Sequence, residues 1–162
     1  MKTTLSIESN PWINLRDWPS YDLWASENGL TGQNSLPEDD LDGDGASARE
    51  EFAFGSDHLE GNSLPFRKIG TITNAGSTWL TQSYLRRSGG VTQPNGEYLA
   101  VGLNSAGQAS SIPQNWAPPS VPTVNPVGLP PAPVGYLWFN HRYPDPIADQ
   151  DKAFLRIRAS VR

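Results

Sequence analysis

Apolar and polar residues alternate most clearly in the last ten residues of the chain. The apolar positions are Leu155, Ile157, Ala159 and Val161, and the polar positions between them are Arg156, Arg158, Ser160 and Arg162. A period of two residues predicts a strand with one face on a core and the other in water. Further strands are predicted at 79–87, 97–103 and 136–141. In the second of these, one face would carry Leu99, Val101 and Leu103.

Clusters of glycine, proline, asparagine and serine separate the predicted strands. They lie at 88–90, 94–96 and 105–107 and are typical of turns. The expected fold class is therefore mainly β, with a small antiparallel β-sandwich over 59–162. Eight of the 15 prolines fall in 113–133, which predicts a stiff proline-rich loop or crossover there. The alternative is a polyproline ligand for a partner domain, because Pro119 to Pro122 matches PxxP.

The chain before the sandwich carries the pattern of two short helices. Ser20 and Gly29 are typical N-cap and stop residues for a first helix. A second helix is predicted to begin after Ser47, with Glu50 completing a capping box, and to stop at Gly55. The aromatic residues of the two helices, Tyr21 and Trp24 on one and Phe52 and Phe54 on the other, are expected to pack together. The chain thus divides into an extended segment at 1–19, a helical unit at 20–58 and the β-sandwich.

The twelve residues from position 40 to position 51 place oxygen-bearing side chains at fixed intervals. Aspartates stand at loop positions 1, 3 and 5, a glycine at 6 and a glutamate at 12: Asp40, Asp42, Asp44, Gly45 and Glu51. This ligand order wraps one hard cation, and Ca²⁺ is the cation that fits it. The carbonyl of Ala46 at position 7 would be a further ligand, and a water would stand at Ala48. The alternative is an acidic, solvated turn.

Four runs of this region together resemble a thrombospondin type 3-like calcium motif, an EF-hand-type, dockerin-like loop followed by a helix. They are Tyr21–Trp24, Gly29–Gly32, Asp40–Glu51 and Phe54–Asp57. An entering helix is not expected, because Leu36-Pro37-Glu38-Asp39 precedes the loop. The resemblance implies a place near the C-terminal end of a large secreted or surface protein of environmental bacteria. In that family a small β domain of unassigned function follows, and its last strand carries alternating arginines, as Ala153–Arg162 does.

The motif and the resemblance favour a non-catalytic extracellular module in which calcium stabilises a spacer, an anchor or an interaction domain. The expected metal site is Asp40, Asp42, Asp44, Ala46 and Glu51. The expected partners are the calcium ion and either a polysaccharide or a cell-surface protein. No cysteine is present, so a bound ion would replace the disulfides that secreted domains of this size often use. Residues 1–7 lack the apolar core of an export sequence, so secretion would require a longer parent or an upstream start.

Charge is divided unevenly along the chain. Residues 1–60 hold 13 acids and 3 bases, a net charge of −10, and residues 61–162 hold 4 acids and 9 bases, a net charge of +5. The basic residues form no polybasic run, which argues against a nucleic-acid partner. No stretch of the sequence approaches transmembrane length, so membrane insertion is not expected.

Aromatic residues offer a second function, that of a carbohydrate-binding module. The chain has six tryptophans and an aromatic run at 136–139, which would suit a sugar if the rings formed an exposed row. In a spacer or anchor, Trp79, Trp138 and Phe139 would instead be mostly buried. Trp138 and Phe139 are adjacent and must point to opposite faces of a strand, so the proline-rich loop is expected to cover the outward ring.

A secreted glycoside hydrolase is the third function considered. It would need two carboxylates facing a cleft, and the candidates outside the metal loop are Asp145, Asp149 and Asp151. A proline-bounded acidic turn explains these residues as well. The two histidines, His58 and His141, are isolated in the sequence, and their spacing suggests neither a zinc site nor a catalytic base.

Overall fold

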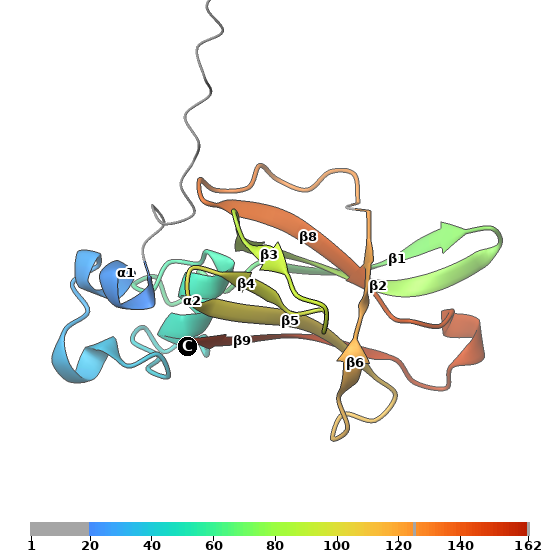
Figure 1. The fold of residues 1–162 in the computed structure, drawn as a ribbon, viewed down its shortest axis with the longest axis horizontal. Coiled ribbons are helices and arrows are strands. Elements are labelled where there is room, and N and C mark those ends of the chain that lie inside the picture. Colours follow the sequence, from blue (N-terminus) through green and yellow to red (C-terminus); the bar gives the residue numbers. More distant parts are fainter. Residues whose placement is uncertain (1–19, 125, 162) are drawn as a thin grey trace, which may run out of the picture.

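A computed structural model describes residues 20–124 and 126–161, so the expected extended segment at 1–19 lies outside the described residues. Two antiparallel sheets face each other, with two short helices at one end (Figure 1). The first sheet has the strand order β1-β2-β8-β7, and the second has the order β3-β4-β5-β6 with β9 paired to β5. This arrangement confirms the predicted fold class, a mainly β protein built as a small antiparallel sandwich.

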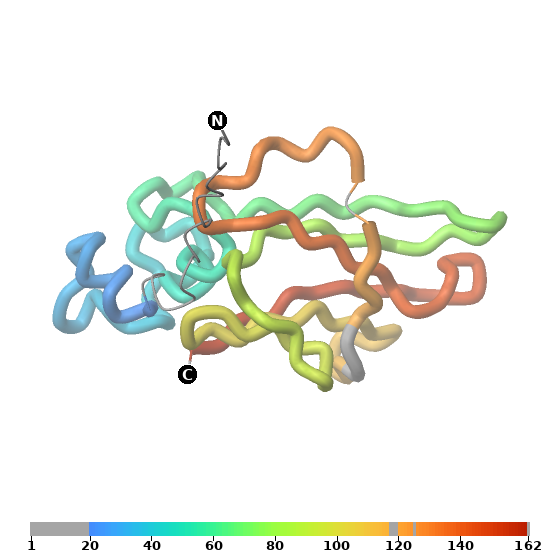
Figure 2. Tube along the Cα trace, turned by 45° about the horizontal axis from the view of Figure 1, so that its top comes forward, coloured from blue at the N-terminus to red at the C-terminus, as the bar shows by residue number. Residues whose placement is uncertain are grey.

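The strands range from two to eleven residues. The first sheet contains β1 (Arg67–Asn74), β2 (Ser77–Arg87), β7 (Val121–Thr123) and β8 (Tyr136–Arg142). The second contains β3 (Val91–Thr92), β4 (Tyr98–Ala100), β5 (Leu103–Ser110), β6 (Ala117–Pro119) and β9 (Phe154–Val161). The β1–β2 hairpin extends away from the helices, toward the right-hand side of Figure 2.

The last strand confirms the clearest pattern in the sequence. β9 pairs with β5 in a continuous register from Phe154 opposite Ser110 to Val161 opposite Leu103. The apolar residues at 157, 159 and 161 pack against the hydrophobic core cluster. Because neighbours on a strand point to opposite faces, the arginines at 156 and 158 lie on the outer face of the second sheet.

Two predictions about the middle of the chain were wrong. The strand predicted at 97–103 is a hairpin: β4 ends at Ala100, Val101 and Gly102 form the turn with φ of 49° and 76°, and β5 begins at Leu103. Two successive residues with positive φ are what a tight two-residue hairpin turn requires. The turn predicted at 105–107 lies instead inside β5. Its small residues allow close packing there, not a change of direction.

The prediction of a proline-rich loop over 113–133 was only partly correct, because the segment also contains the short strands β6 and β7. Both lie at the ends of their sheets, where the missing N–H of a proline costs no ladder hydrogen bond. The segment crosses from the second sheet to the first and then runs along β8 (Figure 2). There the Pro130 carbonyl accepts a hydrogen bond of 2.7 Å from Trp138 Nε1, and the Val124 carbonyl accepts one of 2.7 Å from Asn140.

The first helix and its cap follow the predicted pattern. α1 spans Tyr21–Glu27, and the Ser20 side chain accepts from the N–H of Leu23. Gly29, just beyond the helix, has the left-handed backbone expected of a stop residue, with a φ of 75°. A short 3-10 turn, η1 (Gly32–Ser35), follows. Residues 36–39 contain no helix, as predicted.

The second helix is capped as its sequence predicts, and the predicted metal loop precedes its N-terminus. α2 spans Ala48–Phe54, Ser47 and Glu50 form the full capping box, and Gly55 ends the helix with a left-handed backbone. At its other end, the Phe52 carbonyl accepts hydrogen bonds from Arg87 Nε at 3.0 Å and from the Tyr136 hydroxyl at 2.9 Å. These two side chains from the first sheet satisfy a helix carbonyl that has no partner within the helix.

The helical unit and the sandwich share one hydrophobic core. The ring of Phe52 is fully buried against Tyr21 and Trp24, at centroid distances of 5.7 and 5.4 Å. Phe54 points the other way and meets Tyr84 of β2 edge-on at 6.0 Å. The same cluster continues to Leu103 of β5. The position of the predicted metal loop is therefore tied to the packing of both sheets.

A second 3-10 turn, η2 (Ile147–Asp149), lies between β8 and β9.

Candidate metal centre

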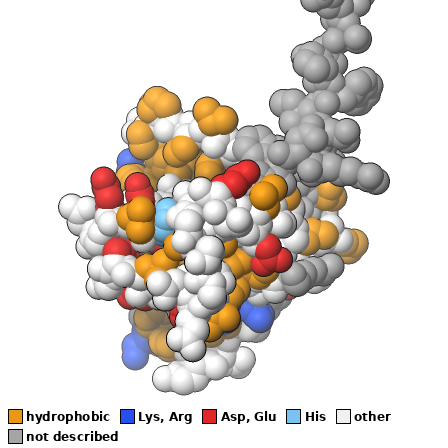
Figure 3. Space-filling view, turned by 90° about the vertical axis from the view of Figure 1, so that its left-hand side faces the viewer, with side chains coloured by type: hydrophobic (Ala, Val, Ile, Leu, Met, Phe, Trp, Pro, Cys, Tyr) orange, Lys and Arg blue, Asp and Glu red, His pale blue; other side chains and the backbone are white. Residues whose placement is uncertain are grey.

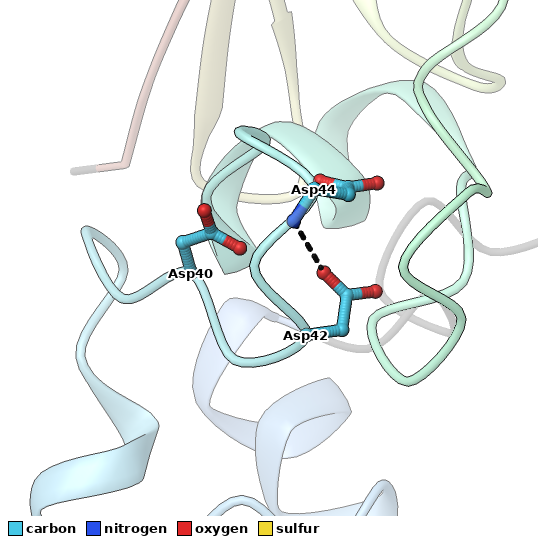
Figure 4. Close-up of side chains that lie close together, drawn as sticks. All are labelled: Asp40, Asp42 and Asp44. Carbon is cyan, nitrogen blue, oxygen red and sulfur yellow. Dashed lines mark hydrogen bonds between the residues drawn. The ribbon is translucent and has the colours of Figure 1, made fainter.

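The three aspartates of the predicted loop lie close together, with Asp40 on one side and Asp42 and Asp44 on the other (Figure 4). Oxygens of Asp40, Asp42 and Asp44 lie within 4.8 Å of one another. Each carboxylate is held by backbone N–H groups of the loop itself. Asp40 accepts from the N–H groups of Gly43 at 2.8 Å and Gly45 at 3.0 Å, one on each oxygen. These bonds make the loop curl around its own side chains.

The other two aspartates use one oxygen for the loop and leave the second unpaired. Asp42 Oδ1 accepts from the N–H of Asp44 at 3.2 Å, and Asp44 Oδ1 accepts from the N–H of Ala46 at 2.7 Å. Asp42 Oδ2 and Asp44 Oδ2 are buried and have no hydrogen-bond partner. A buried carboxylate oxygen without a partner is costly, so a cation at this point would remove an unfavourable feature of the loop.

Glu51, on α2, also has a buried carboxylate oxygen without a hydrogen-bond partner. Its side chain is 1% exposed, and its Oε1 has no hydrogen-bond partner. It lies outside the group of three aspartates defined by the 4.8 Å separation. Burial, followed by the negative charges of Asp42, Asp44 and Asp40, raises the pKa of Glu51 from 4.5 to about 7. In the ion-free protein this carboxylate is therefore destabilised when charged.

Backbone hydrogen bonds close the ends of the loop on each other. The N–H of Ala48 donates to the Asp39 carbonyl at 2.7 Å, and the N–H of Arg49 donates to the Pro37 carbonyl at 3.0 Å. Arg49 also forms an ion pair of 2.7 Å with Glu38. No described residue donates a hydrogen bond to the carbonyl of Ala46, the predicted seventh-position ligand. The carbonyl is thus available to a cation.

A segment after α2, residues 56–63, covers the loop, which the sequence reasoning did not predict. A Cβ on Gly61 would lie 3.1 Å from the carbonyl oxygen of Asp42, so the segment passes directly against the loop. His58 is buried edge-on against Trp24 at 5.3 Å. The turn residues in Ser56-Asp57-His58-Leu59-Glu60-Gly61-Asn62-Ser63 were the available signal, but they do not say where the turn packs.

The chemistry of the five groups fits a hard cation. Carboxylate and carbonyl oxygens are the ligands that Ca²⁺ prefers, and a bidentate glutamate at position 12 would complete six protein oxygens before any water is counted. The arrangement places negative charge on the face of the molecule shown in Figure 3, where acidic side chains are spread over the surface and basic ones lie at its margins. Of the five predicted ligands, Asp40, Asp42 and Asp44 form one cluster, Ala46 lies in the same loop, and Glu51 is buried on α2.

His141, isolated in the sequence, belongs to a buried polar network between the two sheets. It is completely buried, its Nδ1 forms a hydrogen bond with the Ser120 hydroxyl, and its Nε2 lies 3.1 Å from Gln82 Oε1. Since the amide oxygen of Gln82 can only accept, Nε2 carries the proton and Nδ1 accepts from Ser120. The network joins β8 and β2 to the crossover between the sheets. The sequence offered no signal for it, because the three residues lie far apart along the chain.

We expect His141 to remain neutral down to low pH, because burial lowers its pKa from 6.5 to about 4. An unfolded-state histidine takes up a proton near pH 6.5, so this residue's contribution to the free energy of unfolding is complete above that pH and falls as the pH is lowered toward 4. The ring C–H signals of His141 in an NMR titration provide the measurement. A midpoint near the ordinary value would contradict the buried, neutral assignment.

The residues considered for the other two functions are aromatic side chains of β2 and β8 and the aspartates around η2. Trp79, Trp138 and Phe139 are half-buried. For a spacer or an anchor they were predicted to be mostly buried. Trp138 meets Phe66 edge-on at 77°, so these two rings form no flat row. Asp145, Asp149 and Asp151 are exposed around η2, and they do not line the cavities beside Ser110, Tyr98 or Arg158.

None of the described helices is long and apolar enough to cross a membrane. Comparison of the chain with known protein families, with curated proteins and with solved structures finds no match.

Proposed function

We propose that this chain is a non-catalytic calcium-binding module in which the ion stabilises the junction between the helical unit and the β-sandwich. The ligands are the side chains of Asp40, Asp42, Asp44 and Glu51 and the carbonyl of Ala46, with a water at the position of Ala48. The observation that carries the proposal is the set of buried carboxylate oxygens without partners, Asp42 Oδ2, Asp44 Oδ2 and Glu51 Oε1. An acidic solvated turn would expose these oxygens to water instead.

The role of the ion in this proposal is structural. The loop stands at the N-terminus of α2, and the buried face of α2 belongs to the core cluster that reaches both sheets. A cation among four carboxylates converts their mutual repulsion into attraction and fixes α2 on the sandwich. Such a module serves a larger secreted or surface protein as a spacer, an anchor or an interaction domain, which is the role suggested by its resemblance to thrombospondin type 3-like motifs.

A calorimetric titration of chelator-stripped protein with calcium tests the proposal. We expect one site with a dissociation constant of about 10⁻⁵ to 10⁻³ M, the range of extracellular and weaker sensor loops. Magnesium should compete poorly, because it demands a smaller octahedral shell and retains its waters. The variant Asp42→Asn removes one charge from the loop and should weaken calcium binding by about tenfold or more.

A matched control for this titration is Asp149→Asn, which removes one negative charge from an exposed turn outside the loop. It should leave the dissociation constant within about twofold of the unmodified protein, since solvent and salt screen the charge of an exposed residue outside the loop. Absence of calcium binding by the stripped protein, or equal weakening by both variants, would refute the proposed site.

A further inference from the structure

The second sheet ends in an open edge along β9. This strand pairs with β5 over eight consecutive residue pairs without a bulge, and no described residue forms a backbone hydrogen bond with its other side. In Figure 1, β9 lies below β5, on the side of β5 opposite β4. Every second N–H and C=O along the strand therefore faces away from the sheet, and such an edge is a template for another strand.

A groove of about 350 Å³ runs beside this open edge. It lies between residues 156–160 of β9 and the first turn of α2, from which Arg49 and Glu50 contribute. Three arginines and one glutamate line it, which gives a net charge of +2. The positive charge of the groove attracts carboxylates to the edge of β9.

The charged groups differ in whether they already have partners. Arg49 is paired with Glu38 at 2.7 Å, and the Glu50 carboxylate is paired with Arg67 at 3.6 Å. Arg156 donates to Gln108 Oε1 at 2.7 Å and lies 4.2 Å over the ring of Trp116, so its guanidinium is held in place without an acid.

Arg158 is exposed and forms no ion pair among the described residues. It stands two positions from Arg156, so both guanidinium groups lie on the same face of the strand, about 7 Å apart along it. Carboxylates at alternate positions of an added strand have the same repeat.

We propose that the edge of β9 binds an extended acidic peptide segment, which extends the second sheet by one strand and places alternate carboxylates against Arg156 and Arg158. Strand addition supplies affinity through the main chain and specificity through alternate side chains. Charge argues against a second copy of β9 as the occupant, because self-pairing would bring arginines against arginines. On the opposite side of the second sheet, β6 contains two prolines, which makes it a poorer template than β9.

Fluorescence anisotropy with a labelled ten-residue peptide of alternating glutamate and threonine tests this, with the protein saturated in calcium. We expect saturable binding to the unmodified protein, weakened about tenfold or more by Arg158→Glu. The matched control, Lys68→Glu, makes the same charge change at an exposed position of β1 and should alter the dissociation constant by less than about twofold. In NMR spectra the amide shifts should concentrate in residues 154–161.

Two altered peptides separate strand addition from simple charge attraction. A peptide with lysine in place of glutamate should not bind, and a glutamate peptide with N-methyl groups at alternate amides should bind about tenfold more weakly, since it cannot complete the ladder. Equal binding of either altered peptide, or amide shifts that map away from β9, would overturn the proposal. Concentration-dependent dimerisation through β9 would overturn it as well.

Discussion

Glu51→Gln should abolish most of the stabilisation that calcium provides, without destabilising the ion-free protein. At a free calcium concentration about 100 times the dissociation constant, one bound ion raises the free energy of unfolding by about 2.7 kcal/mol. Gln lacks the charge and the bidentate carboxylate that position 12 supplies, so most of this increment should disappear. Urea unfolding with excess calcium and with a chelator measures the difference.

Without calcium, Glu51→Gln should cause no loss of stability. The pKa of Glu51 is raised to about 7 in the folded ion-free protein. A raised carboxylate pKa contributes stability at low pH that is lost as the pH rises from about 4.5 to about 7. At a pH of about 8 the variant Glu51→Gln should therefore be as stable as the unmodified protein or more stable, because it removes a buried charge whose Oε1 has no hydrogen-bond partner.

Glu50→Gln is the matched control, since the two residues are adjacent and the change is identical. Glu50 accepts from the N–H of Ser47 and pairs with Arg67, and it contributes to the helix cap and not to the ion. Its loss should lower the free energy of unfolding by about 0.5–1 kcal/mol equally with and without calcium. An equal loss for Glu51→Gln in the two conditions would instead assign Glu51 to a structural contact.

Gly107→Ala should be among the most damaging single-methyl additions in the sandwich. A Cβ at this position would overlap both the Ser120 hydroxyl oxygen and the imidazole of His141, and the N–H of Ser120 donates to the Gly107 carbonyl at 3.1 Å. The added carbon must displace a buried, fully bonded network, so a loss of about 3 kcal/mol is expected, at the upper end of overpacking effects. Urea unfolding in saturating calcium measures it.

Gly70→Ala provides the comparison in the same type of element. Gly70 lies in β1, and a Cβ there would meet only the Thr81 hydroxyl, at an ordinary contact distance of 3.5 Å. The substitution should change the free energy of unfolding by less than about 1 kcal/mol. Similar losses at both glycines would show that the packing around His141 yields easily, contrary to the interpretation of a tight network. Should Gly107→Ala fail to accumulate as folded protein while Gly70→Ala does, the prediction also holds.

The features that could be predicted from sequence are those whose causes lie within a dozen residues. The Ser47–Glu50 capping box, the stop at Gly55 and the spacing of Asp40, Asp42 and Asp44 depend on local backbone geometry, and the structure shows each where its pattern places it. The alternation in 153–161 also predicted which side of β9 faces the core. The cap, the stop and the loop aspartates each depend on a fixed local spacing, and the strand depends on a period of two residues, so a short stretch is sufficient to identify each of them.

The tertiary structure alone decided the rest, because long-range contacts override weak local preferences. Ser105-Ala106-Gly107 has turn-like composition, yet it lies within β5, where small residues admit the imidazole of His141 from the other sheet. Tertiary contacts also decide that residues 56–63 pack against the predicted metal loop, where Gly61 lies next to the carbonyl of Asp42. The open edge of β9 is a further example, since whether a strand has a neighbour depends on the order of strands in the sheet. The composition of a segment limits the conformations that it can adopt. The residues that pack against it determine which of these conformations has the lowest free energy.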